Sequence, residues 1–285
     1  MVPNPILSFI LFGQEFKIYL YGLCIGIGIL ACMVVFFVYT RKKGIDEKVS
    51  DFAFFVAILA IALGFLAAKF FQALYNWIGS GFTEFNFYDA GITAMGGFVG
   101  GAITFIIAYF FGGKLLFKEN ELLRQREQFN IILLVAPICV TIAHAFGRIG
   151  CLFGGCCHGA YLGQNPVAGG VYMEGVEYGW GYYVPVQLYE AIFLFILTAV
   201  LSVLYFKRFN ITHVIYLISY GVWRFVIEFF RGDSVFEGVE GVKSIFDILS
   251  PSQCQSIIFI SVGIIILIVY KKKKIPYVLP EGKNY

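Results

Sequence analysis

Long apolar runs alternate with short polar segments along the whole chain. An α-helix needs about 20 apolar residues to cross the hydrocarbon core of a bilayer, and each run approaches that length. We therefore predict an all-α polytopic membrane protein with seven transmembrane helices in a single transmembrane domain, residues 1–285. The predicted helices cover residues 18–40, 52–75, 93–112, 131–150, 187–206, 212–230 and 256–270.

Composition supports this prediction. The chain is 59% hydrophobic and 14% charged, and its mean hydropathy is +0.81. Soluble domains carry roughly 25% charged residues. The formal net charge is only +3, which gives no support to nucleic-acid binding.

Basic residues indicate how the helices are oriented, because cytoplasmic loops are enriched in Lys and Arg. If the N-terminus lies outside, the segments that face inward contain fifteen of the 21 Lys and Arg residues. The C-terminus, which carries the run Lys271–Lys274, is then cytoplasmic. The predicted outer loops are residues 76–92, 151–186 and 231–255.

Four of the remaining cations fall in the outer halves or at the outer ends of predicted helices. A charge within a membrane helix is costly, about 3 kcal/mol on insertion scales, and it usually marks a functional site. The four cations therefore predict an anionic ligand at the outer interface. The alternative is that each side chain extends to the lipid headgroups without a ligand. These cations are Lys69, Arg148, Arg224 and Arg231.

A polar stripe interrupts the sixth predicted helix, in the sequence YGVWRFVIEFFRGD. Tyr220, Arg224 and Glu228 recur every four residues and so share one helix face, and Arg231 follows on nearly the same face. Such a face should point into the bundle or a wet cavity rather than toward lipid. An ion pair between Arg224 and Glu228 that only holds helices together is the alternative.

A second polar group lies in HAFGRIGCLFGGCCHG, residues 144–159. His144 and Arg148 are one helical turn apart, and Gly150 and Gly159 belong to a set of glycines that allow a ligand to approach the backbone. The planar guanidinium of Arg148, together with backbone N–H groups, suits phosphate oxygens. Further along, Gln187, Tyr189 and Glu190 start a helix at the outer edge, where capping and interface anchoring are the alternatives.

Cysteines gather in the same stretch. Cys151, Cys156, Cys157 and His158 have the spacing C-x4-C-C-H, which is not a standard zinc arrangement, so we expect no metal and no cofactor. A metal site, a disulfide and a nucleophilic thiol stay open as alternatives. The other helical cysteines have the character of small buried apolar residues: Cys24, Cys32 and Cys139.

These motifs resemble a known family, the bacterial phosphatidylglycerol–prolipoprotein diacylglyceryl transferases. The likeness spans most of the chain, and its last three motifs in this order are specific. The motifs are Tyr21-Gly22, GFLAAKFFQALYN at 64–76, MGGFVGG at 95–101, GRIG at 147–150, QLYE at 187–190 and YGVWRFVIEFFRGD at 220–233. The resemblance implies a multi-pass protein of the bacterial inner membrane, with its active site at the outer leaflet.

The resemblance also implies a reaction and a set of site residues. The thiol of a lipobox cysteine in a secreted preprotein would take the diacylglyceryl group of phosphatidylglycerol, and glycerol phosphate would leave. Arg148 and Arg224 would bind the phosphate, and Lys69 stands where many relatives carry arginine. The expected catalytic residues are His144, Arg148, Cys151, Cys156, Tyr220, Arg224 and Glu228. The expected substrate-binding residues are Tyr21, Lys69, Gly96, Gly97, Gly150, Gly159, Gln187, Tyr189 and Arg231.

The sequence departs from the family pattern at three positions. Cys151 stands at the position of a family Asn and Cys156 at that of a family Glu, while Met95 replaces a His proposed as the base. His144 or His158 could serve as the base instead. The acceptor thiol therefore stays open. Two further hypotheses are an acyl-transfer or redox enzyme that uses the cluster cysteines, and a non-enzymatic lipid- or metal-binding protein on the same scaffold.

Overall fold

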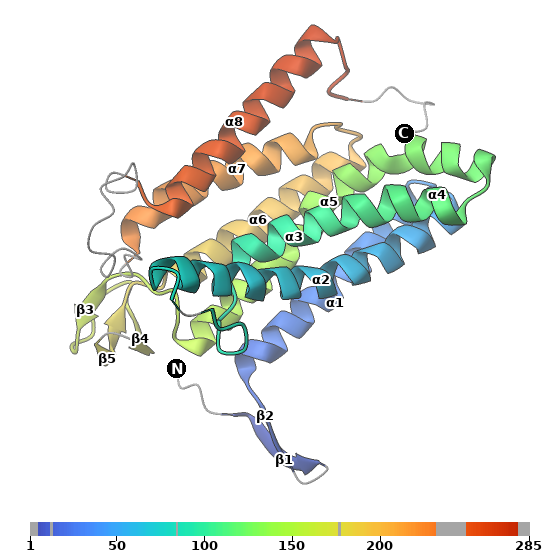
Figure 1. Ribbon diagram of the computed structural model, residues 1–285. Helices are drawn as coiled ribbons and strands as arrows, with labels where there is room; N and C mark the ends of the chain where they lie inside the picture. Colours follow the sequence, from blue (N-terminus) through green and yellow to red (C-terminus); the bar gives the residue numbers. More distant parts are fainter. Residues whose placement is uncertain (1–4, 12–13, 84, 176–177, 232–248, 279–285) are drawn as a thin grey trace. The chain divides into compact units, whose positions relative to one another are not determined.

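A computed structural model describes residues 5–11, 14–83, 85–175, 178–231 and 249–278 of the chain (Figure 1). These residues are mostly helical, and seven helices are long and apolar enough to cross a membrane. The predicted fold class is confirmed, whereas the orientation of the termini stays a prediction. Most of the predicted outer loop 231–255 lies outside the described residues. The helical elements are α1 (Leu20–Lys42), α2 (Glu47–Gly79), α3 (Ala94–Ile107), η1 (Ala108–Gly112), α4 (Gly113–Leu116), α5 (Glu119–Gly154), α6 (Val186–Phe206), α7 (Thr212–Ile227), η2 (Glu228–Phe230) and α8 (Pro251–Lys272).

Several helices extend beyond their apolar runs. Helix α5 begins at Glu119 rather than at residue 131, because its first turns are rich in Glu, Leu, Arg and Gln, which favour helix without being apolar. Its other end reaches Gly154, so Cys151 lies in the helix and not in an outer loop. Helix α8 begins at Pro251, where Ser250 and Gln253 form a reciprocal capping box.

Short β-structure, which the sequence did not predict, flanks the helices. Strands β1 (Leu7–Leu11) and β2 (Gln14–Ile18) pair antiparallel before α1. Between α5 and α6, strands β3 (Tyr161–Gly163), β4 (Val171–Gly175) and β5 (Gly179–Tyr183) form an antiparallel sheet in the order β3-β5-β4. The predicted outer loop 151–186 is thus built around a small sheet.

The chain divides into two compact units. One unit comprises Met1–Phe36 and Leu133–Asn284, and the other comprises Phe37–Ile132. The first unit contains the start of α1, most of α5, the three-stranded sheet, α6, α7 and α8. The second contains α2 and α3. We describe each unit by itself.

The first unit is held together by apolar packing and by hydroxyl groups that bond across helices. Thr212 of α7 donates to the carbonyl of Leu134 in α5 over 2.8 Å, and Thr198 of α6 donates to Thr141 of α5 over the same distance. Such bonds join helices where no water competes. Under the sheet, Leu152 packs with the buried Met173 and Tyr183, which fixes the end of α5 against the strands.

Candidate functional site

Glu190 of α6 stands at the centre of a buried charge cluster in the first unit. Its side chain is 1% exposed, and its Oε2 lies 2.9 Å from Nε of Arg148 on α5 and 3.8 Å from Nη1 of Arg224 on α7. The other oxygen, Oε1, accepts a hydrogen bond from the Tyr220 hydroxyl over 3.2 Å and lies 3.7 Å from Nε2 of His144. Two helices, α5 and α7, therefore contribute polar and charged groups to one carboxylate on a third helix, α6.

The stripe predicted on α7 extends this cluster toward the end of the helix. Nη2 of Arg224 lies 2.9 Å from Oε2 of Glu228 and donates to the Ser252 hydroxyl of α8 over 2.8 Å. Nε of Arg231 lies 3.9 Å from the same oxygen of Glu228. The ion pair between Arg224 and Glu228 is thus real, yet Arg224 also faces Glu190, so it does more than join two turns of one helix.

Two buried guanidinium groups belong to the cluster from different helices. Arg148 of α5 and Arg224 of α7 face the carboxylates of Glu190 and Glu228, and Arg231 lies beside Glu228 with a further interaction of its own. Nε of Arg148 is close to Glu190, but its N–H is not aligned with the carboxylate oxygen. Among the described residues, neither this atom nor Nη1 of Arg224 has a hydrogen-bond acceptor, although both are buried. The arrangement can accept an anion that brings oxygen acceptors.

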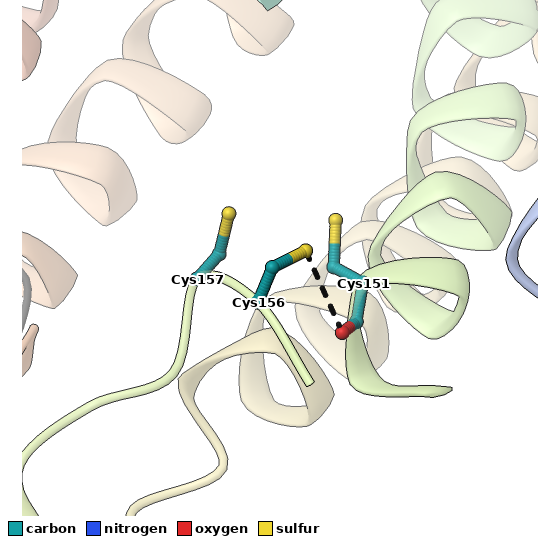
Figure 2. A group of neighbouring side chains, drawn as sticks. All are labelled: Cys151, Cys156 and Cys157. Carbon is teal, nitrogen blue, oxygen red and sulfur yellow. Dashed lines mark hydrogen bonds between the residues drawn. The ribbon is translucent and has the colours of Figure 1, made fainter. Parts of the chain in front are cut away.

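Three thiols form a second cluster beside the first. The Sγ atoms of Cys151, Cys156 and Cys157 all lie within 4.8 Å of one another. Figure 2 shows Cys151 on the last turn of α5 and the other two on the loop that follows, with the three sulfur atoms pointing to the same side. All seven cysteines of the chain are described, and all are free thiols.

Charge and hydrogen bonding give the thiols of the cluster different pKa values. Hydrogen bonds with Cys151 and then Cys156 lower the pKa of Cys157 far below its usual range, and Arg148 and Arg231 add to the effect. For Cys156, the hydrogen bond with Cys151 favours the thiolate, but the bond with Cys157 and burial outweigh it and raise the pKa to about 11. Arg148 and Arg231 therefore favour the thiolate form of Cys157.

Tyr21 of α1 lies against the same end of α5. A side chain added at Gly150 would meet the backbone oxygen of Tyr21 at 3.2 Å and its ring at 3.3 Å. At Gly154 an added side chain would have the Tyr21 ring at 3.5 Å and the Cys156 sulfur at 3.9 Å. The glycines let Tyr21 approach the thiols, and the expected contact of Tyr21 and Gly150 with substrate stays a prediction.

The predicted residues of α6 have different positions. Gln187 is fully buried, and its Nε2 donates to the Cys156 carbonyl over 2.8 Å, which ties the thiol loop to α6. Tyr189 is 37% exposed, and its hydroxyl donates to the Gly169 carbonyl over 3.2 Å. Gln187 therefore supports the site, whereas the contact of Tyr189 is with the sheet region.

His158 and Gly159 connect the sheet to the end of α7. The His158 ring packs on Tyr183 with 4.3 Å between ring centroids, and its Nδ1 is 3.0 Å from the Gly159 carbonyl. Gly159 forms an isolated β-bridge with Arg231. His158 belongs to the packing of the sheet and is not a member of the thiol group. Its predicted role as a metal ligand or base gains no support from these contacts.

Lys69, Gly96 and Gly97 belong to the other compact unit. Nζ of Lys69 lies 5.4 Å from the centre of the Phe87 ring, and Lys69 lines an open apolar hollow of ≈ 420 Å³. Gly96 and Gly97 are on α3, and side chains added there would meet Phe71 and Ala68 of α2. The two glycines allow α2 and α3 to approach closely, and their predicted contact with substrate stays a prediction.

Glu190 is the residue that the list of expected site residues omitted. The signal was present in the sequence, since a carboxylate five residues after Pro185 in an apolar run is as costly as the arginines. Because Glu190 lies near the start of the predicted helix, the sequence favoured a capping role for it instead. Ser252 of α8, which contacts Arg224, gave no comparable signal, because a lone serine at a helix start is common.

Comparison with known proteins gives one consistent result. The family model for prolipoprotein diacylglyceryl transferase matches residues 8–269. A protein of Clostridium tetani (strain Massachusetts / E88), named phosphatidylglycerol–prolipoprotein diacylglyceryl transferase, is 30% identical over 289 residues, which cover 95% of this chain and 99% of the relative. A protein of the same name from Streptococcus pneumoniae (strain Taiwan19F-14) is 31% identical over 273 residues, 93% of this chain and 94% of the relative. The chain belongs to the prolipoprotein diacylglyceryl transferase family.

Proposed function

We propose that this protein transfers the diacylglyceryl group of phosphatidylglycerol to the cysteine thiol of a secreted prolipoprotein. Family membership supports the reaction, and the relatives are named for this donor and this acceptor. The protein would work in the bacterial inner membrane with its N-terminus outside and the charge cluster at the outer leaflet. The distribution of Lys and Arg in the sequence supports that orientation.

The observation that carries the proposal is that two buried guanidinium groups, Arg148 and Arg224, converge from different helices. Each keeps a buried nitrogen without a hydrogen-bond acceptor among the described residues, so the site favours a ligand that brings acceptors. The phosphodiester of phosphatidylglycerol is an anion that offers oxygen acceptors to Arg148 and Arg224. The hydrogen-bond donors left without acceptors, Nε of Arg148 and Nη1 of Arg224, are those that the phosphate would engage.

The same residues account for the chemical step. The acceptor cysteine attacks the glyceryl carbon as a thiolate, after its proton has passed to solvent. A C–S bond forms, and the C–O bond to phosphate breaks with its electron pair on the phosphate oxygen. The departing glycerol phosphate gains a negative charge, which Arg148 and Arg224 stabilise. Glu190 and Glu228 hold these guanidinium groups in place, so donors are positioned before the charge develops.

The direct experiment incubates the purified protein with phosphatidylglycerol and a synthetic peptide that contains a lipobox cysteine. We expect the peptide to gain the mass of one diacylglyceryl group and glycerol phosphate to be released in equal amount. A peptide with Ser in place of the cysteine is the matched control and should gain no mass. Absence of both products with the cysteine peptide would contradict the proposal.

A further inference from the structure

We propose that Cys151, Cys156 and Cys157 bind one zinc ion through three thiolates, and that the fourth position of the ion takes the acceptor cysteine. The proposal rests on the transferase function proposed above and adds to it the means of holding the acceptor. The thiols have no role in the phosphate site formed by Arg148 and Arg224, and all three are free.

The distances between the sulfur atoms suit a metal ion. The three Sγ atoms lie within 4.8 Å of one another. A tetrahedral zinc ion with Zn–S bonds of about 2.3 Å holds its sulfur ligands roughly 3.8 Å apart. Small side-chain rotations would bring the sulfur atoms to the separation that zinc requires. Figure 2 shows the three sulfur atoms on one side of the loop, with that of Cys156 turned toward the Cys151 carbonyl, to which it donates a hydrogen bond.

The backbone conformation around the cluster brings the three sulfur atoms together. Cys151 is fixed on the last turn of α5, and the chain then reverses through Gly155 at φ 66° and Cys157 at φ 60°. A non-glycine residue in the left-handed region is uncommon and persists where its surroundings hold it. The fully buried Gln187 supplies part of that support through its bond to the Cys156 carbonyl.

Local charge favours the loaded cluster. One zinc ion with three thiolates carries a net charge of −1, which would be costly at a partly buried site without cations. Arg148 interacts electrostatically with Cys151 and Cys157, and Arg231 interacts with Cys157. Both guanidinium groups therefore lower the cost of negative charge on the thiols, although Glu190 and Glu228 already compensate part of their charge.

Three ligands leave one position open. Structural zinc sites are usually closed by four protein ligands, whereas catalytic sites keep a position for substrate. Among the described residues, the group that could hold a metal consists of the three thiols alone. His158 is the adjacent side chain of suitable type, but its Nδ1 faces the Gly159 carbonyl and its ring packs on Tyr183.

A zinc ion at this place would prepare the acceptor for attack. A thiol that coordinates zinc is deprotonated, so its proton passes to solvent and the sulfur remains as a thiolate. The thiolate lone pair forms the C–S bond while the C–O bond to phosphate breaks, and one negative charge passes from the zinc-bound sulfur to the phosphate. The zinc centre changes from −2 to −1 and the phosphate from −1 to −2, so the total charge is unchanged. The product sulfur is a neutral thioether and a poor ligand, so it leaves the ion. No oxidant or reductant is needed.

Metal binding is tested first, on the whole protein purified in detergent and freed of metal under reducing conditions. We expect the wild type to bind one zinc ion per chain. Cys151→Ser, Cys156→Ser and Cys157→Ser should each weaken binding by more than the 10–100-fold that is typical of supporting residues. Cys254→Ser, which removes a thiol outside the cluster, should bind like wild type. The zinc site would be overturned if the triple variant bound zinc as tightly as wild type, or if the cluster contained a disulfide.

Acceptor binding is tested on the wild type, so it does not depend on how variants fold. Cobalt(II) replaces zinc and reports each bound thiolate by charge-transfer absorption. We expect a lipobox peptide with cysteine to increase this absorption and the Ser peptide to leave it unchanged. Identical spectra with both peptides would overturn the role of the fourth position.

The two proposals can fail separately. If the metal-free protein transfers diacylglyceryl as fast as the zinc-loaded protein, the zinc proposal is wrong while the transferase function stands. If the cysteine peptide changes the cobalt spectrum but no loaded protein releases glycerol phosphate from phosphatidylglycerol, the acceptor site is supported and the transferase function is wrong.

Discussion

At the scale of single residues, Glu190 has the largest number of charged neighbours in the site as described. It pairs with Arg148 and faces Arg224, and it accepts a hydrogen bond from Tyr220. The carboxylate thus fixes the position of two guanidinium groups that come from different helices. Its removal would leave both cations buried with too little compensation.

We therefore expect Glu190→Gln to destabilise the protein by about 3–5 kcal/mol, the usual cost of breaking a buried ion pair from one side. The thermal midpoint in detergent measures this effect, and transferase activity should fall with it even below the midpoint. Glu119→Gln, at an exposed position at the start of α5, is the control. Equal midpoints for Glu190→Gln and wild type would contradict the central position of Glu190.

Substitution of Arg148 tests whether the planar geometry of its guanidinium group matters in addition to its charge. Lysine keeps the positive charge but lacks the planar fork that binds two oxygens. We expect Arg148→Lys to lower kcat by about 10²–10³-fold, as when one donor to a developing anion is removed, with little change in the thermal midpoint. Arg126→Lys, at an exposed position of α5, should be fully active. Normal activity of Arg148→Lys would show that charge alone suffices.

At the scale of elements, the link between α5 and the three-stranded sheet decides where the thiols point. Gly155 and Gly179 share φ 66°, but a side chain at Gly155 would clash with the Glu174 carbonyl, whereas one at Gly179 meets nothing within 4 Å. Alanine at Gly179 would therefore introduce only backbone strain, whereas alanine at Gly155 would introduce the same strain and a steric clash. Comparing the two variants separates these costs.

Gly179→Ala should cost about 1–2 kcal/mol, because a left-handed residue with a Cβ is strained. Gly155→Ala should cost more, and it should also weaken metal binding and activity by displacing Cys156 and Cys157. Thermal midpoints and zinc affinity measured on both variants check this. The expectation is wrong if the two variants behave alike.

Helix α7 shows how far an element could be predicted from its pattern. The spacing of Tyr220, Arg224 and Glu228 required a common face, and their contacts with Glu190 and with one another confirm it. The sheet between α5 and α6 could not be predicted in this way. Its strands have three to five residues, and their Gly and Tyr content lacks an alternation that would indicate strand.

At the scale of the whole molecule, the basic residues predict one topology. A fluorescent protein fused after the C-terminus should fold in the cytoplasm and fluoresce, and alkaline phosphatase fused there should be inactive. The same phosphatase fused after Gly163, in the loop expected outside, should be active because it requires export. The opposite pattern would reverse the proposed orientation and place the charge cluster at the inner leaflet.

The sequence by itself determined the number of membrane-length helices and most of the charged residues of the site. Both depend on local physics, because a bilayer demands about 20 apolar residues in a row and makes every charge within them conspicuous. The seven helices and the shared face of α7 needed no tertiary information. Family motifs such as GRIG and QLYE were equally readable along the chain.

Only the tertiary structure decided which groups meet. Glu190 and Arg148 are 42 positions apart in the sequence, and no spacing rule shows that one carboxylate of α6 would meet cations from both α5 and α7. The convergence of Cys151, Cys156 and Cys157 depends in the same way on the left-handed turn and on the buried Gln187. Contacts between distant segments follow from packing, which a linear pattern does not contain.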